Sequence, residues 1–232
     1  MYPIRVVAVF GWFLLMSPFV LLVSCLRPFK PANGTLYTRA LGPVALWLLG
    51  LRLEVRGHEK IASAMPCVFL LNHQHLLDLF VVATFFPPRT VTIGKKSLAW
   101  VPLFGWIYLL SGHLLIDRGN RSRAVQTLDR AGDLLKARGL SVMVCPEGTR
   151  SRGRGLLPFK QGAFRLALMT GLPVQAWVVK PYDSPESPLR PQRRKVLVSI
   201  LDPVPSTGDA ESLAKRMHGA FENELARLAS EK

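Results

Sequence analysis

The chain has 232 residues, of which 49% are hydrophobic and 19% are charged, and its formal net charge is +15 at pH 7. This length allows one ordinary domain with a short appendage, and the composition excludes a disordered chain. The positive charge fits either a polyanionic partner (nucleic acid, an anionic membrane or a phosphorylated substrate) or a general surface bias. The three cysteines, Cys25, Cys67 and Cys145, follow no metal-like spacing and fit a reducing compartment.

The chain begins with two apolar runs, residues 6–26 and residues 40–51. The first contains 21 residues, which just suffices to cross a bilayer core of about 30 Å, and the second is too short to span. Gly34 and two nearby prolines are expected to turn the chain between the runs. We predict that residues 1–52 form a two-helix membrane anchor rather than core helices. The first helix either spans or lies with the second in one leaflet, with Pro18 bending it.

After the anchor, strand-like and helix-like segments alternate. We predict strands at residues 53–56, 66–71, 90–94, 113–116, 141–145, 174–179 and 195–201. We predict helices at residues 76–86, 103–110, 121–138 and 160–170, and a last helix capped by Asp209. The stretch 180–194, rich in Pro and Arg, is predicted to be a loop. This alternation predicts an α/β fold for residues 53–232, with a mixed central sheet flanked by helices.

The motif Asn-His-Gln-His-Leu-Leu-Asp at residues 72–78 follows a predicted buried strand and opens a predicted helix. Strand ends of this kind are where ligands bind in open α/β folds. Five residues turn a helix by about 500°, so His73 and Asp78 can meet only if His73 precedes the helix and Asp78 lies in its first turns. The carboxylate would then orient the imidazole and leave its other nitrogen as a base. As an isolated pattern, a capped helix start explains the motif better.

Several cationic segments also follow predicted strands or open predicted helices. The motif Pro-Glu-Gly-Thr-Arg-Ser at residues 146–151 offers backbone N–H groups, hydroxyls and Arg150, which can grip a phosphate with two parallel bonds. Lys160 is expected to open the helix 160–170, whose N-terminus favours anions. Lys96 and Arg118 follow two further strands. Each could be a solvated charge, but their shared position at element ends indicates a phosphate site.

Four blocks in this order resemble the 1-acyl-sn-glycerol-3-phosphate acyltransferase family of the glycerolipid acyltransferases. The blocks are residues 72–78, residues 96–118, residues 146–162, and Pro173 with Val174. The two N-terminal runs are also similar to the membrane appendage of this family. The fourth block, which is associated with acyl-chain placement, departs from the family pattern. The family usually has another proline a few residues on, whereas this chain reads Gln175-Ala176-Trp177.

The resemblance implies an enzyme of phospholipid biosynthesis that moves a fatty acyl chain from acyl-CoA or acyl carrier protein to the sn-2 hydroxyl of 1-acyl-sn-glycerol 3-phosphate, giving phosphatidic acid. His73 would be the general base and Asp78 would orient it. The residues implied in binding the substrate phosphate are Arg150, Lys96, Arg118, Glu147, Gly148 and Thr149, with Asn72 and Lys160 as further candidates. No metal and no cofactor are implied, because a thioester is already activated.

The implied partners are the lysophospholipid, the thioester donor and membrane lipid, with no nucleic acid. More Lys and Arg follow the first apolar run than precede it, so we expect the active site on the cytoplasmic face of the membrane. In a bacterium this would be the inner membrane.

Three alternatives stay open. A sister enzyme would acylate another acceptor, such as lyso-ornithine lipid or glycerol 3-phosphate. A metallohydrolase would use His73, His75 and Asp78, joined by His113, although this spacing differs by one residue from the familiar His-x-His-x-Asp-His run. A non-catalytic binder would be held to a membrane or nucleic acid by charge alone.

Overall fold

The computed structural model describes residues 2–117, 119–182 and 194–231, which form two compact units. Unit 1 comprises Met1–Leu53, Leu76–Ile116 and Tyr182–Val196. Unit 2 comprises Glu54–His75, Asp117–Pro181 and Leu197–Lys232. Most of the predicted loop 180–194 lies outside the described residues, and so does Arg118.

Unit 2 contains a mixed sheet with the strand order β1-β7-β6-β2-β5. The strands are β1 (Leu51–Arg56), β2 (Val68–Leu71), β5 (Ser141–Val144), β6 (Val174–Val179) and β7 (Arg194–Ile200). Strand β2 pairs in parallel with both β5 and β6, and β7 pairs antiparallel with β6. Every residue of β2 and β6 is buried, and β2 reads as the continuous apolar run expected of a strand that is paired in parallel on both sides.

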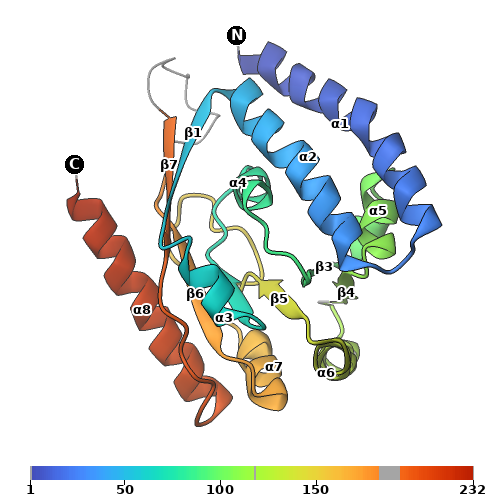
Figure 1. The fold of residues 1–232 in the computed structure, drawn as a ribbon. Helices are drawn as coiled ribbons and strands as arrows, with labels where there is room; N and C mark the ends of the chain where they lie inside the picture. The colour runs from blue at the N-terminus through green and yellow to red at the C-terminus, as the bar shows by residue number, and fades with distance from the viewer. Residues whose placement is uncertain (1, 118, 183–193, 232) are drawn as a thin grey trace. The chain divides into compact units, whose positions relative to one another are not determined.

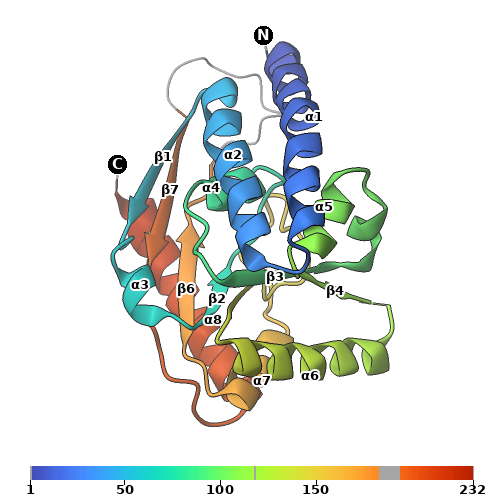
Figure 2. The same ribbon diagram turned by 45° about the vertical axis from the view of Figure 1, so that its right-hand side comes forward.

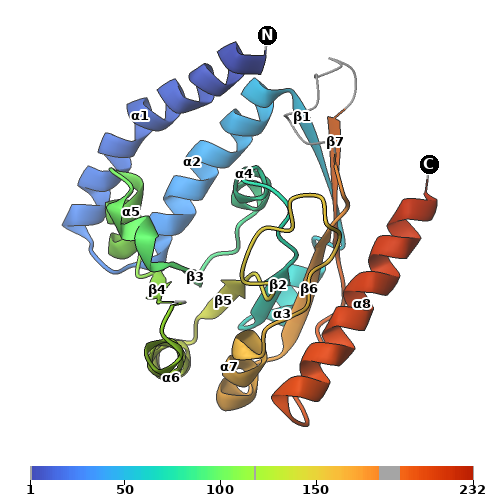
Figure 3. The same ribbon diagram turned by 180° about the vertical axis from the view of Figure 1, so that it is seen from behind.

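The described part of unit 2 has the helices α3 (Lys60–Ala64), α6 (Arg121–Arg138), α7 (Gly162–Thr170) and α8 (Ala210–Ser230). Figure 2 shows α6 and α7 side by side, and Figure 3 shows α8 running along β6. The side chains of Asn120 and Asp209 cap α6 and α8. The expectation that Lys160 opens a helix is wrong, because its backbone N–H donates to the oxygen of Pro146 and α7 begins two residues later.

Unit 1 is mainly helical. Its helices are α1 (Tyr2–Leu26), α2 (Pro31–Leu49), α4 (Asp78–Thr84), the 3-10 helix η1 (Lys96–Trp100) and α5 (Phe104–Leu110). Strands β3 (Thr90–Lys95) and β4 (Leu114–Ile116) pair in parallel. Helices α1 and α2 lie side by side (Figure 1).

The turn expected at Gly34 is wrong, because Gly34 lies inside α2. Pro31 is the first residue of this helix, where its missing N–H and fixed φ suit a helix start. Gly34 instead allows a close approach: a Cβ there would lie 2.6 Å from Nε2 of His113. Pro18 also lies within α1 and does not end it.

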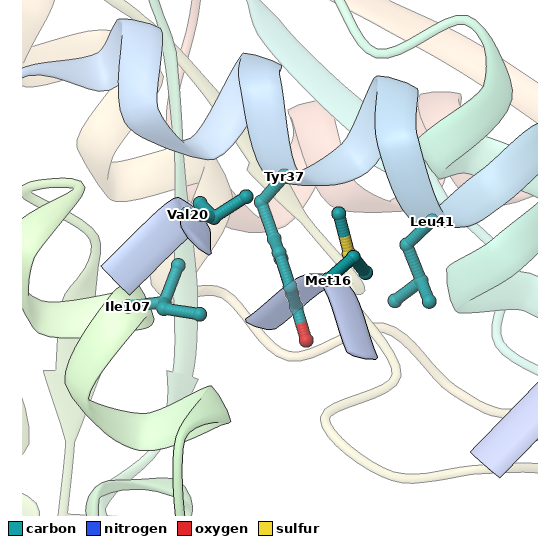
Figure 4. Packing of buried hydrophobic residues seen from close by; sticks show 5 residues of the cluster. All are labelled: Met16, Val20, Tyr37, Leu41 and Ile107. Atoms are coloured by element: carbon teal, nitrogen blue, oxygen red, sulfur yellow. The ribbon is translucent and has the colours of Figure 1, made fainter. Parts of the chain in front are cut away.

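The core of unit 1 joins α1, α2 and α5. Met16 and Val20 of α1 pack with Tyr37 and Leu41 of α2 and with Ile107 of α5 (Figure 4). Each of these side chains is at most 8% exposed. The packing of the two N-terminal helices against each other therefore extends to a later segment of the chain.

Helix α1 also exposes large apolar side chains. They include Ile4, Val7, Phe10, Leu15, Phe19 and Leu22, all more than half exposed. Among the described residues, the stretch Pro3–Leu26 is the one helix that is long and apolar enough to cross a membrane. Exposed apolar surface of this extent is typical of a membrane or protein contact.

Candidate active site

Three parallel strands of unit 2 direct the predicted motifs to one edge of its sheet. The carboxyl ends of β2, β5 and β6 lie at the same edge because these strands are parallel and in register. Asn72 and His73 follow β2, the segment 145–151 follows β5, and Lys180 follows β6. His73 thus stands in the connection after β2, and Asp78 is the first residue of α4, as the spacing required.

The amide of Asn72 fixes this connection to the end of β6. Its Nδ2 donates to the oxygen of Val179 at 3.0 Å, and the N–H of Val179 donates to its Oδ1 at 2.8 Å. Gln74 adds a bond from its Nε2 to the same oxygen at 2.8 Å. Asn72 is only 4% exposed, so its amide acts as a support for the residues around it.

The carboxylate of Glu147 joins the segment after β5 to the backbone of His73. It is 3% exposed and accepts the N–H of His73 at 2.6 Å and the N–H of Leu157 at 3.0 Å. On the other side, the N–H of Ser151 donates to the oxygen of His73 at 2.7 Å. On the side of His73 these bonds involve its backbone groups, so they fix the position of the residue without engaging its imidazole nitrogens.

A lysine lies directly against the glycine of the 146–151 motif. Gly148 has a φ of +69°, and a Cβ there would lie 3.0 to 3.1 Å from the end of the Lys160 side chain. The N–H of Lys160 donates to the oxygen of Pro146 at 2.8 Å, which closes the loop between them. Arg154 folds back onto the loop by donating to the oxygen of Ser151. Unit 2 therefore gathers the ammonium of Lys160 onto the same loop that carries Arg150.

Two of the predicted site residues, Asp78 and Lys96, belong to unit 1. Lys96 is exposed at the start of η1, whereas Asp78 is fully buried. The phenol of Tyr182 donates to Oδ1 of Asp78 at 2.6 Å. Burial first, then the charge of Asp78 and this hydrogen bond, raise the pKa of Tyr182. No sequence signal indicated Tyr182, since it lies in a stretch that reads as a loop.

His113 packs among aromatic rings of unit 1. Its Nδ1 accepts the N–H of Thr92 at 3.2 Å, and its ring packs against Tyr108 and Phe86. Burial lowers the pKa of His113 to about 4, so it is neutral at physiological pH. In the described part of the chain, no three His, Cys, Asp or Glu side chains come together in a group that could hold a metal ion.

The residues of the departing fourth block are buried with partners of their own. Gln175 is fully buried and accepts the indole N–H of Trp177 at 3.0 Å. The ring of Trp177 packs on Phe69 of β2, with their centroids 5.0 Å apart. In this chain a hydrogen-bonded glutamine and a packed tryptophan thus occupy the block in which the related family usually carries a proline.

The chain matches known proteins along most of its length. Residues 52–180 match a family model described as Acyltransferase. The 1-acyl-sn-glycerol-3-phosphate acyltransferase of Escherichia coli K12 is 34% identical over 235 residues, covering 100% of this chain and 96% of its own. The enzyme of the same name from Haemophilus influenzae is 33% identical, covering 94% of this chain and 97% of its own.

A solved structure shares the fold. The crystal structure of the 1-acyl-sn-glycerophosphate acyltransferase PlsC from Thermotoga maritima superposes with a TM-score of 0.75 at 24% identity, covering 100% of this chain and 99% of that one. The α/β fold predicted from the sequence is thereby confirmed. The chain belongs to the acyltransferase family, and within it to the group of the 1-acyl-sn-glycerol-3-phosphate acyltransferases.

Proposed function

We propose that the protein transfers a fatty acyl chain to the sn-2 hydroxyl of 1-acyl-sn-glycerol 3-phosphate, which gives phosphatidic acid for phospholipid biosynthesis. The observation that carries this proposal is the identity of 34% along the whole chain with enzymes that bear this activity in their name. The acyl donor is a thioester of coenzyme A or of acyl carrier protein. The proposal includes no metal and no cofactor.

His73 is the proposed general base. It takes the proton from the acceptor hydroxyl, and the oxygen attacks the thioester carbonyl carbon. The tetrahedral intermediate then collapses, the C–S bond breaks, and the thiolate leaves with the proton that the imidazolium returns. Asp78 is proposed to orient the imidazole and to stabilise its protonated form. The bonds from Glu147 and Ser151 to the backbone of His73 support this assignment, because a base must be held in place to act efficiently.

Cationic side chains are proposed to bind the acceptor phosphate. Arg150 and Lys160 lie on one closed loop, where the hydroxyl of Thr149 adds a donor. Gly148 shapes the turn, because its N–H donates to the oxygen of Cys145 at 3.0 Å. Lys96 and Arg118 complete the proposed set. Glu147 has a different part in the proposal, because its carboxylate accepts two backbone N–H groups and would repel a phosphate.

We also propose that the enzyme works at the cytoplasmic face of a membrane, which in a bacterium would be the inner membrane. The exposed apolar side chains of α1 support membrane association, and the surplus of Lys and Arg after the first apolar run supports the orientation. Residues 1–52 are proposed as the anchor and residues 53–232 as the catalytic domain.

Purified enzyme tests the proposal when it is supplied with a panel of acceptors and both thioester donors and the products are identified by mass spectrometry. The panel contains lysophosphatidic acid, lyso-ornithine lipid and glycerol 3-phosphate. We expect phosphatidic acid to be the main product. Efficient acylation of lyso-ornithine lipid or glycerol 3-phosphate, with little product from lysophosphatidic acid, would replace the proposed acceptor.

The variant Arg150→Lys shows whether the site recognises phosphate. It keeps the charge but loses the two-pronged geometry of the guanidinium. Losing one charge-assisted hydrogen bond is worth about 1.5–3 kcal/mol, so the KM for lysophosphatidic acid should rise by roughly one to two decades while the KM of the donor stays unchanged. A rise confined to the donor, or an equal effect on an acceptor without a phosphate monoester, would contradict the role of Arg150.

A further inference from the structure

The carboxylate of Asp78 has a partner that the sequence motif does not contain. Asp78 is 0% exposed at the start of α4, and the phenol of Tyr182 donates to its Oδ1 at 2.6 Å. Distances of about 2.5–2.7 Å are typical of strong O–H···O⁻ hydrogen bonds. A buried carboxylate stays charged only where such donors replace the water it has lost.

The chain just before Tyr182 is itself attached to the other end of the motif. Val179, three residues earlier, exchanges two hydrogen bonds with the side chain of Asn72 and accepts a third from Gln74. The short segment 179–182 therefore contacts both Asn72 and Asp78, residues six positions apart in the motif. The chain at and after the end of β6 therefore holds both ends of the motif.

From this geometry we infer that Tyr182 is a positioning residue for the reaction, which fixes the carboxylate of Asp78 in one orientation. The inference rests on the proposed function, in which Asp78 acts on the general base His73. Tyr182 touches neither substrate nor the reacting atoms in this account. It remains a proton donor throughout the working pH range of the enzyme, because burial and the neighbouring carboxylate raise its pKa.

Loss of the phenolic hydroxyl has two expected effects that differ in their readout. A less constrained carboxylate orients the base poorly, which lowers kcat without weakening substrate binding. A buried carboxylate that has lost this donor is also harder to keep charged, and only the charged form can orient the base and stabilise its protonated state. The acid limb of the pH profile of kcat should therefore move to higher pH. A residue that merely fills space would not move this limb.

The test compares Tyr182→Phe with Tyr108→Phe in the full-length enzyme, with lysophosphatidic acid as acceptor. Tyr108 is a matched control, because its phenol is also hydrogen-bonded, to Thr92 at 2.7 Å, and has no part in the proposed site. For Tyr182→Phe we expect kcat to fall by roughly tenfold or more, as for the loss of one hydrogen bond to a charged group, with both KM values unchanged and the acid limb shifted upward. Tyr108→Phe should keep the wild-type profile.

Two results would overturn the inference. One is a kcat of Tyr182→Phe close to that of the wild type. The other is a lower kcat with an unshifted acid limb, which would assign Tyr182 a packing role. His73→Ala, assayed in parallel, separates this inference from the proposed function. If His73→Ala is inactive and Tyr182→Phe is normal, the inference alone fails; if His73→Ala is active, the proposed function fails.

Discussion

At the scale of single residues, Glu147 connects two segments that lie far apart in the sequence. Its buried carboxylate accepts one N–H from His73, 74 positions earlier, and one from Leu157. Both acceptor oxygens are thus committed to backbone donors. A buried charge held in this way orients the backbone around it, because each of the two bonds is lost if the loop moves.

Glu147→Gln tests this role. The amide keeps one acceptor oxygen but turns an NH₂ group toward the other backbone N–H, so one bond is replaced by a repulsion. We expect the free energy of unfolding to fall by about 1.5–3 kcal/mol and kcat to fall with it, while the KM for the acceptor changes little. Chemical unfolding and steady-state kinetics measure both quantities.

The matched control for this prediction is Glu222→Gln. The side chain of Glu222 is 61% exposed and its carboxylate lies 3.4 Å from Nδ1 of His218, so its change should alter neither quantity. A Glu147→Gln enzyme with wild-type kcat would contradict this role. A defect that lies wholly in the acceptor KM would instead indicate that Glu147 belongs to the phosphate-binding residues.

At the scale of elements, helices α2 and α4 approach each other closely at Gly42. A Cβ at this position would lie 2.7 Å from the backbone nitrogen of Thr84 and 2.8 Å from the carbonyl carbon of Ala83. Backbone atoms cannot rotate away from such a contact as a side chain can. Since α4 begins at Asp78, the position of that carboxylate depends on a helix contact far from it in the sequence.

Gly42→Ala should therefore lower activity although residue 42 has no part in the chemistry. Overpacking typically costs about 1–3 kcal/mol, and the displaced α4 carries Asp78 with it. Gly11→Ala in α1 is the matched control, because a Cβ there meets nothing within 4 Å. Its effect should be neutral or slightly stabilising, by up to about 1 kcal/mol, since alanine favours helices. Thermal unfolding and the rate of acyl transfer are measured for both variants. Equal stability and equal activity of the two variants would contradict this account.

Helix α8 is attached at its end by a network of ion pairs. Arg227 binds both carboxylate oxygens of Glu224, at 2.6 and 2.8 Å, and also binds Glu231, which in turn binds Arg56 near the end of β1. The hydrogen bonds from Arg227 lower the pKa of Glu224 below its ordinary value of 4.5. A group with a lowered pKa stabilises the fold above that ordinary value, and the contribution is lost as the pH falls through the folded pKa.

Arg227→Ala should thus destabilise the protein modestly at pH 7, because solvent partly screens the half-exposed guanidinium of this pair. The difference from the wild type should shrink below pH 4.5, where Glu224 becomes protonated in the variant. Urea unfolding at pH 7 and pH 4 measures this. Lys215→Ala, which removes an exposed cation of the same helix, should show no such pH dependence. An Arg227→Ala effect that is constant with pH would contradict the assignment.

At the scale of the whole molecule, the sequence predicted those features that depend on neighbouring residues. Strand β2 reads as a continuous apolar run, and Asp209, which the sequence predicted as a cap, caps α8. Helix α3 was missed because five residues are too few for a periodic pattern. The start of α2 was misplaced because Pro31, read as a turn residue, is equally suited to the first position of a helix.

The candidate site was predictable in its motifs and not in its supports. His73 and Asp78 stand where their spacing required, before and at the start of α4. The partners that hold the motif come from residues 74 to 107 positions away, as with Glu147, Val179 and Tyr182. Contacts over such separations depend on the packed fold and leave no local signal in the chain.

The central claim is that His73 is the base of an acyl transfer to lysophosphatidic acid. Its most direct measurement is the rate of phosphatidic acid formation by His73→Ala, with His75→Ala as the neighbouring control and with fold and membrane binding verified for both. We predict a loss of roughly 10²–10⁴ in rate for His73→Ala and a much smaller change for His75→Ala. A His73→Ala enzyme within a few-fold of the wild type would contradict the claim, and so would equal losses at both histidines that zinc restores.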